Sequence, residues 1–178
     1  MYSNSIRHAL DKFHDYVANN LAICQNHSAA RVSPFWAEHF SDRKNFPDTQ
    51  DFLAFRRGDF LYGIGDTKPS SAEQKQREFS NVCKSIELFT PASFIENLHE
   101  PFLGSPLVFP YGQNSLSASY VLNAGTTWRI KELVRQHGPQ AKALHVCEIG
   151  AGWGGCASQL HQVCDVASYT VIDLPENL

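Results

Sequence analysis

The chain has 178 residues, of which 43% are hydrophobic and 19% charged, a composition typical of a globular domain that buries one sizeable core. Its formal net charge of -3 at pH 7 and its scattered Lys and Arg exclude the strongly basic surface that attracts nucleic acids and anionic lipids. No apolar run approaches the roughly 20 residues that span a bilayer. We therefore expect a cytoplasmic protein with neither a nucleic-acid nor a membrane partner. The adjacent Arg56 and Arg57 are expected on a solvated surface.

The first 70 residues carry helical patterns. Apolar residues recur at steps of three and four and predict a helix over about residues 5–24. Ser33-Pro34 combines a capping residue with a proline at the first helical position, and it predicts a short helix that contains Phe35, Trp36 and Phe40. A further helical turn is predicted over residues 48–55.

Two more helices are predicted between residues 71 and 98. The first runs from Ser71 to about Phe89, and its apolar set at helical spacing is Phe79, Val82, Cys83 and Ile86. The sequence Thr90-Pro91 is expected to cap the second, which ends near Leu98.

A loop and a long helix follow. The prolines and glycines between Glu100 and Ser115 break regular structure and predict a loop. The helix is predicted from about Ser117 to Gln136 and ends through C-cap chemistry at Gly138. Its inward residues are expected to be Val121, Ala124, Trp128, Ile130, Leu133 and Val134.

The pattern changes at about residue 140, and we place a domain boundary there. Residues 143–149 predict a strand that helices cover on both faces. Gly150, Gly152 and Gly154 then predict a turn with positive φ angles. A helix that turns Ala157, Leu160 and Cys164 inward follows, and residues 166–172 predict a second strand, parallel to the first. The fold class is therefore α/β, with a mainly helical region over residues 1–140 and the start of a Rossmann-like domain over residues 141–178.

The glycine turn and the acid after the second strand indicate a nucleoside site. Asp173 would lie beside the turn, where its two oxygens can accept hydrogen bonds from both hydroxyls of a ribose. The alternative is that Asp173 caps a helix that begins at Pro175.

Two cofactor classes fit this turn. Gly150-x-Gly152-x-x-Gly155 matches the dinucleotide pattern of NAD(P)-dependent Rossmann oxidoreductases. Glu148 precedes the first glycine by two residues and favours S-adenosylmethionine, because an acid there repels a pyrophosphate but attracts an ammonium group. A non-catalytic association module is a third alternative.

Several motifs resemble one family. Glu148-x-Gly150-x-Gly152-x-Gly154 resembles the first motif of class I S-adenosylmethionine-dependent methyltransferases, and Ile172-Asp173-Leu174-Pro175 resembles the second motif of small-molecule O-methyltransferases. The upstream segments that resemble the sugar O-methyltransferases of bacteria are Ser33-Pro34-Phe35-Trp36, Phe55-Arg56-Arg57, Gly104-Ser105-Pro106 and the helix from Ser117 to Val134. The resemblance implies methyl transfer from S-adenosylmethionine to a hydroxyl of a sugar or a related small molecule. Residues 1–140 would then bind the substrate, form a lid over the site, or mediate association with another chain.

The resemblance also implies a set of cofactor-binding residues. Gly150 and Gly152 would line the methionine part of the cofactor, with Glu148 near its amino group, and Asp173 would bind the ribose. Trp153 would either form a wall of the pocket or pack at the start of the helix, and Gly154 and Gly155 could simply permit close packing of helix on strand. Leu174 would pack on the adenine. The full set of expected cofactor-binding residues is Glu148, Gly150, Ala151, Gly152, Trp153, Asp173 and Leu174.

Neither a catalytic base nor a metal site is indicated. His8 and His14 fall on the polar side of the first helix, and no histidine forms an i, i+4 pair. In the family, the acceptor pocket comes from later strands, and only five residues follow Asp173. We therefore expect an N-terminal fragment that is inactive alone: either a piece of a longer enzyme or a chain that a C-terminal polypeptide completes. A homo-oligomer is the alternative partner. The thiols at Cys24, Cys83, Cys147, Cys156 and Cys164 are odd in number, lack a Cys-x-x-Cys pair, and are expected to be reduced and mostly buried.

Overall fold

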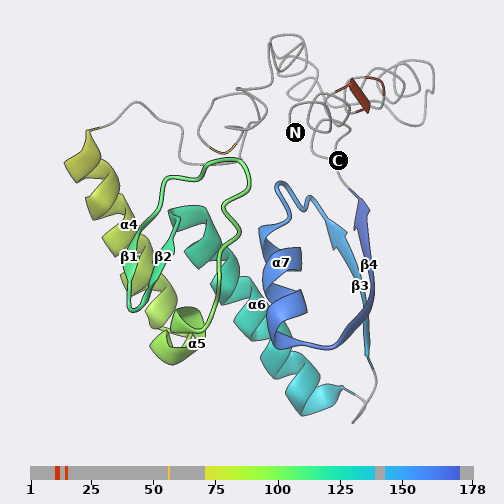
Figure 1. Cartoon of the computed structure of the whole chain (residues 1–178). Coiled ribbons are helices and arrows are strands. Elements are labelled where there is room, and N and C mark those ends of the chain that lie inside the picture. Colours follow the sequence, from red (N-terminus) through yellow and green to blue (C-terminus); the bar gives the residue numbers. More distant parts are fainter. Residues whose placement is uncertain (1–10, 13–14, 16–55, 57–70, 139–142, 173–178) are drawn as a thin grey trace, which may run out of the picture.

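The computed structural model shows a mixed α/β molecule in which helices pack beside two small sheets (Figure 1). The residues that the structure describes are 11–12, 15, 56, 71–138 and 143–172. Asp11, Lys12 and Asp15 are helical and exposed. The rest of the helix expected over 5–24, and the elements expected over 33–40 and 48–55, lie outside the described residues, as does Cys24.

Helix α4, Ala72–Glu87, confirms the helix predicted between residues 71 and 89. The Ser71 hydroxyl accepts a hydrogen bond from the backbone N–H of Gln74 at 3.2 Å and so caps the first turn. Phe79, Cys83 and Ile86 recur at steps of four and three, and all three are buried. The apolar stripe of α4 therefore faces the core.

Helix α5, Ala92–Glu96, is shorter than predicted and begins differently. Pro91 stands at its N-cap position and no side chain caps the helix. Thr90 is buried, and its hydroxyl has no hydrogen-bond partner, so the expected Thr90 cap is wrong. Phe94 and Ile95 are the buried residues of this short helix.

The segment predicted as a loop contains a β-hairpin. Strand β1, Phe109–Tyr111, pairs antiparallel with β2, Asn114–Leu116. Gly112, at φ 56°, lies in the two-residue connection, where a hairpin turn favours left-handed glycine. Pro110 lacks an amide N–H and argued against a strand, but a two-stranded hairpin has only edge strands, where proline is tolerated.

The central element is the long helix α6, Ala118–His137, against which α4, α5 and α7 pack. The Ser117 hydroxyl caps it by accepting the N–H of Tyr120 at 3.2 Å. Val121 and Ala124 are buried as predicted, whereas Leu133 is 58% exposed, which corrects the expectation that it points inward.

Helix α6 ends at Gly138, as predicted, but without a left-handed C-cap. Gly138 has φ -74° and ψ 156°, an extended conformation. Pro139 follows it in the sequence, and a residue before proline is restricted to extended backbone. The proline, and not the glycine's freedom to turn left-handed, thus fixes the exit from the helix.

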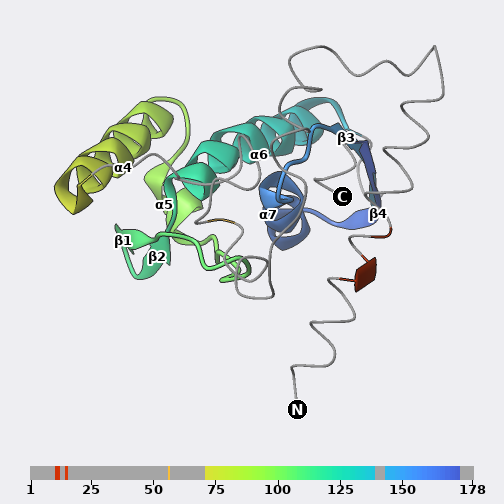
Figure 2. The same cartoon turned by 90° about the horizontal axis from the view of Figure 1, so that it is seen from above.

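A parallel strand pair with one intervening helix forms the C-terminal part of the described chain. Strand β3, Leu144–Ile149, pairs with β4, Val166–Ile172, and α7, Gly155–Val163, connects them. Figure 2 shows α7 between α6 and the strand pair. The predicted boundary near residue 140 falls in the undescribed stretch 139–142, and α6 and α7, on either side of it, pack against each other.

Only one face of β3 is covered. Half-buried residues alternate with exposed ones along the strand, and Ile149 is 80% exposed. The expectation that helices cover both faces is therefore wrong for β3 in this structure. Among the described residues, no helix combines the length and the apolar character that crossing a membrane requires.

Candidate functional site

The turn between β3 and α7 is built from three left-handed glycines. Gly150, Gly152 and Gly154 have φ angles of 76°, 58° and 80°, which confirms the positive φ predicted for them. The N–H of Gly150 donates to the carbonyl of Ile172 at 2.8 Å and so ties the turn to the end of β4. The N–H of Gly154 donates to the carbonyl of Ala151 at 3.0 Å and closes the turn on itself.

Open space surrounds two of these glycines. A Cβ atom added at Gly150 or at Gly154 would meet no neighbour within 4 Å. Glycine is therefore needed there for its backbone conformation, and the same open space leaves the turn accessible to a ligand.

Gly155 has a different role. A Cβ atom there would overlap Nδ2 of Asn123 and come within 2.6 Å of Cζ2 of Trp153. The absent side chain lets the start of α7 approach α6, so the expectation of close helix–strand packing is corrected to close helix–helix packing. Gly154, whose surroundings are open, does not serve packing.

Glu148 lies beside the turn and is held by a tyrosine. It is the second-last residue of β3, and its Oε2 accepts a hydrogen bond from the hydroxyl of Tyr169 on β4 at 2.7 Å. Burial first, and then the bond to Glu148, raise the pKa of Tyr169 above its ordinary value. The phenol thus remains a donor at neutral pH, and the carboxylate of Glu148 keeps further lone pairs for a cationic ligand.

Trp153 packs and is not an isolated wall of the turn. The guanidinium carbon of Arg56 lies 3.6 Å from the centroid of the Trp153 ring, a close cation–π contact. The Trp153 ring also lies 5.8 Å, between centroids, from that of Tyr120 on α6. Trp153 therefore packs at the start of α7, and its role as a wall of the cofactor pocket stays a prediction.

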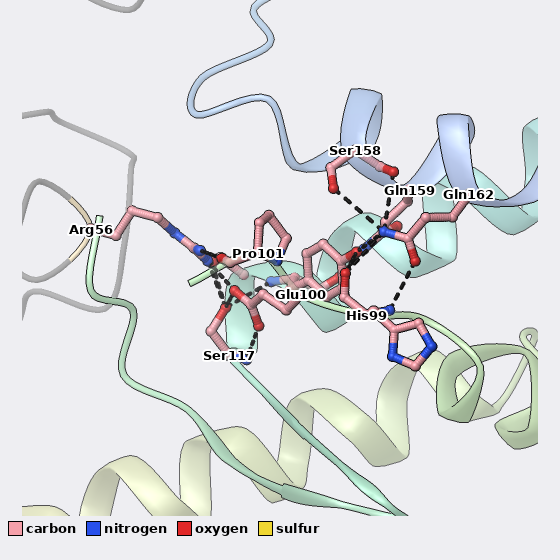
Figure 3. A network of polar contacts seen from close by, with 10 residues as sticks. Arg56, His99, Glu100, Pro101, Ser117, Ser158, Gln159 and Gln162 are labelled. Atoms are coloured by element: carbon pink, nitrogen blue, oxygen red, sulfur yellow. Dashed lines mark hydrogen bonds and ion pairs between the residues drawn. The ribbon is translucent and has the colours of Figure 1, made fainter. Parts of the chain in front are cut away.

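Arg56 contradicts the expectation of a solvated surface arginine. It is 1% exposed and forms an ion pair with the buried Glu100 through Nη2 (Figure 3). The same nitrogen donates to Ser117 Oγ at 3.0 Å, and Nη1 donates to the Pro101 carbonyl at 3.3 Å. A buried charge without a partner costs several kcal/mol, so Arg56 and Glu100 can be buried only because they pair with each other.

Glu100 also fixes the start of α6. Its Oε2 accepts the backbone N–H of Ser117 at 2.5 Å, and its Oε1 accepts the Ser117 hydroxyl at 2.7 Å. The ion pair and the cap of α6 therefore share one carboxylate, in the stretch that was predicted as a plain loop.

Two glutamines join α7 to its neighbours (Figure 3). Gln159 is fully buried; its Oε1 accepts from Thr127 Oγ1 at 2.8 Å, and its Nε2 donates to the Tyr120 carbonyl at 2.7 Å. Gln162 donates to the His99 carbonyl and accepts the His99 N–H, each at 2.9 Å. The expected inward face, Ala157, Leu160 and Cys164, is fully buried only at Leu160.

The structure brings five of the seven expected cofactor-binding residues to one end of β3. These are Glu148, Gly150, Ala151, Gly152 and Trp153. Asp173 and Leu174 lie outside the described residues. Within the described part of the chain, no three His, Cys, Asp or Glu side chains cluster in a way that could hold a metal ion.

Comparison with known proteins adds no relative: no protein-family model, curated protein or solved structure matches this chain.

Proposed function

We propose that the chain binds S-adenosylmethionine at the glycine turn and serves an O-methyltransferase that acts on a sugar or a related small-molecule hydroxyl. The observation that carries the proposal is the turn itself. Three left-handed glycines lie between a parallel strand and a helix, with open space at Gly150 and Gly154. This arrangement supports a Rossmann-like site, in which a nucleoside binds at the carboxyl end of parallel strands.

Glu148 supports S-adenosylmethionine over a dinucleotide. Its carboxylate stands beside the turn, with one oxygen engaged by Tyr169. An ammonium group would gain a charge-assisted hydrogen bond from that carboxylate, whereas a pyrophosphate would be repelled by it. The amino group of S-adenosylmethionine fits the first condition.

The chemistry of the site follows from the cofactor class. When bound, S-adenosylmethionine would supply a methyl group on a positively charged sulfur. The acceptor oxygen would bond to that carbon, the electron pair of the broken carbon–sulfur bond would stay on sulfur, and the proton of the hydroxyl would pass to solvent. The residues described here would bind and orient the cofactor, and the choice of a sugar hydroxyl as acceptor rests on the motif resemblance alone.

Calorimetric titration of the 178-residue chain tests this proposal. S-adenosylhomocysteine is the stable probe, adenosine lacks the amino acid part, and NAD carries the pyrophosphate. We expect binding of S-adenosylhomocysteine and not of NAD. Glu148→Gln is expected to weaken S-adenosylhomocysteine about tenfold, the loss of one charge-assisted bond, and to leave adenosine unchanged.

A matched glycine pair provides the control. Gly150→Ala and Gly112→Ala both place a side chain at positive φ, at 76° and 56°, but only Gly150 belongs to the turn. We expect Gly150→Ala alone to reduce affinity. Binding of NAD in preference to S-adenosylhomocysteine would establish the dinucleotide alternative, and the absence of binding to either would refute a nucleoside site in this chain.

A further inference from the structure

Arg56 links the N-terminal region to the glycine turn. We propose that Arg56 is a positioning residue that holds the turn in its ligand-binding shape through Trp153. The inference rests on the proposed function for the identity of the ligand, but the contact itself stands on the geometry: the guanidinium carbon lies 3.6 Å from the centroid of the Trp153 ring.

The guanidinium is fixed by several hydrogen bonds. Glu100, Ser117 and the Pro101 carbonyl each accept a bond from its terminal nitrogens. The backbone N–H of Arg56 also donates to the carbonyl of Gly104 at 3.0 Å. Arg56 is thus attached to the connection between α5 and β1 and to the cap of α6, and its guanidinium carbon lies over the indole ring.

The indole in turn restrains a segment that has little stiffness of its own. Gly152 and Gly154 flank Trp153, and glycine loses more conformational freedom on ordering than any other residue. The Trp153 ring contacts both Arg56 and Tyr120, and it also fills the space that Gly155 leaves. This single large side chain therefore anchors the middle of the turn.

A pre-organised turn binds its ligand more tightly, because the ordering cost is met before the ligand arrives. Loss of the Arg56–Trp153 contact should leave the helices in place and loosen the turn. The region before residue 140 would then act on cofactor affinity without touching the cofactor.

Two variants remove the contact from opposite sides. Arg56→Lys keeps a positive charge for Glu100 but loses the planar face, and Trp153→Leu leaves the ion pair intact. Each is expected to weaken S-adenosylhomocysteine about tenfold, and the double variant is expected to be no weaker than the single variants. Arg129→Lys is the matched control: Arg129 lies over Phe89 at 4.5 Å, on the outer part of α6, and its replacement should leave affinity unchanged.

Amide hydrogen exchange of residues 150–154, measured without ligand, separates a local loosening of the turn from a general loss of stability. We expect faster exchange there in both single variants and unchanged exchange in α4. If either folded variant exchanges at the turn as the parent does, or if affinity losses add in the double variant, the positioning role is overturned. If the parent binds no S-adenosylhomocysteine, the proposed function fails while the exchange experiment still decides the role of Arg56.

Discussion

Replacement of Gln159 by leucine should destabilise the docking of α7 on α6. Gln159 is fully buried and makes two short bonds, one with Thr127 and one with the Tyr120 carbonyl. Each lost hydrogen bond costs about 0.5–1.5 kcal/mol, and the Thr127 hydroxyl left without this acceptor adds about 1–3 kcal/mol. We therefore expect Gln159→Leu to lower the free energy of unfolding by about 2–6 kcal/mol.

A second substitution tests the physical reason. In Gln159→Leu with Thr127→Val, both partners are apolar and similar in shape to the originals, so the penalty for an unsatisfied group disappears. The double variant should therefore be more stable than Gln159→Leu alone. Urea unfolding followed by circular dichroism measures the parent, both single variants and the double variant, and Gln76→Leu, at an exposed glutamine on α4, is the control. A Gln159→Leu chain within about 0.5 kcal/mol of the parent, or additive effects in the cycle, would refute the reasoning.

Three further outcomes are expected. Alkylation followed by peptide mass mapping should modify the exposed Cys147 well before the buried Cys83. Burial first, and then the charge of Glu87, raise the pKa of Cys83 to about 11. In the unfolded chain this thiol ionises near its ordinary pKa of about 8.5. The stability that Cys83 contributes is therefore complete below that pH and is lost as the pH rises toward 11. Cys83→Ala should flatten this alkaline loss of stability in urea unfolding. Gly155→Ala should cost about 1–3 kcal/mol by thermal unfolding, because its methyl group would press on the Trp153 ring; unchanged stability would show that α7 can shift freely.

The periodic elements could be predicted from the sequence, because their apolar spacing is local. α4 and α6 are found where the three-four spacing places them, and β3 and β4 are found where the short apolar runs of residues 143–149 and 166–172 place them. The β1–β2 hairpin could not, since Pro110 and the nearby glycines conceal a strand whose pairing is set by a two-residue turn. Leu133 shows the same limit: helical spacing identifies a face, but packing decides how far along the helix that face is covered.

Of the candidate site, too, only part could be predicted from the sequence. The left-handed glycines follow from the sequence, because few other residues adopt such backbone angles. The burial of Arg56 depends on Glu100, 44 residues away, and the sequence carried no signal that pairs the two.

The long separation of these partners has a consequence for how the molecule folds. The backbone hydrogen bonds of α4 and of the β1–β2 hairpin join residues that are close in the sequence and can form early. The Arg56–Glu100 pair and the Thr127–Gln159 bond instead close chain segments of 44 and 32 residues. Closing such loops costs entropy before any contact compensates, so contacts of this kind form late. If Arg56 positions the glycine turn as proposed, the turn is then among the last parts to take shape. A ligand that recognises it would select chains that have completed folding.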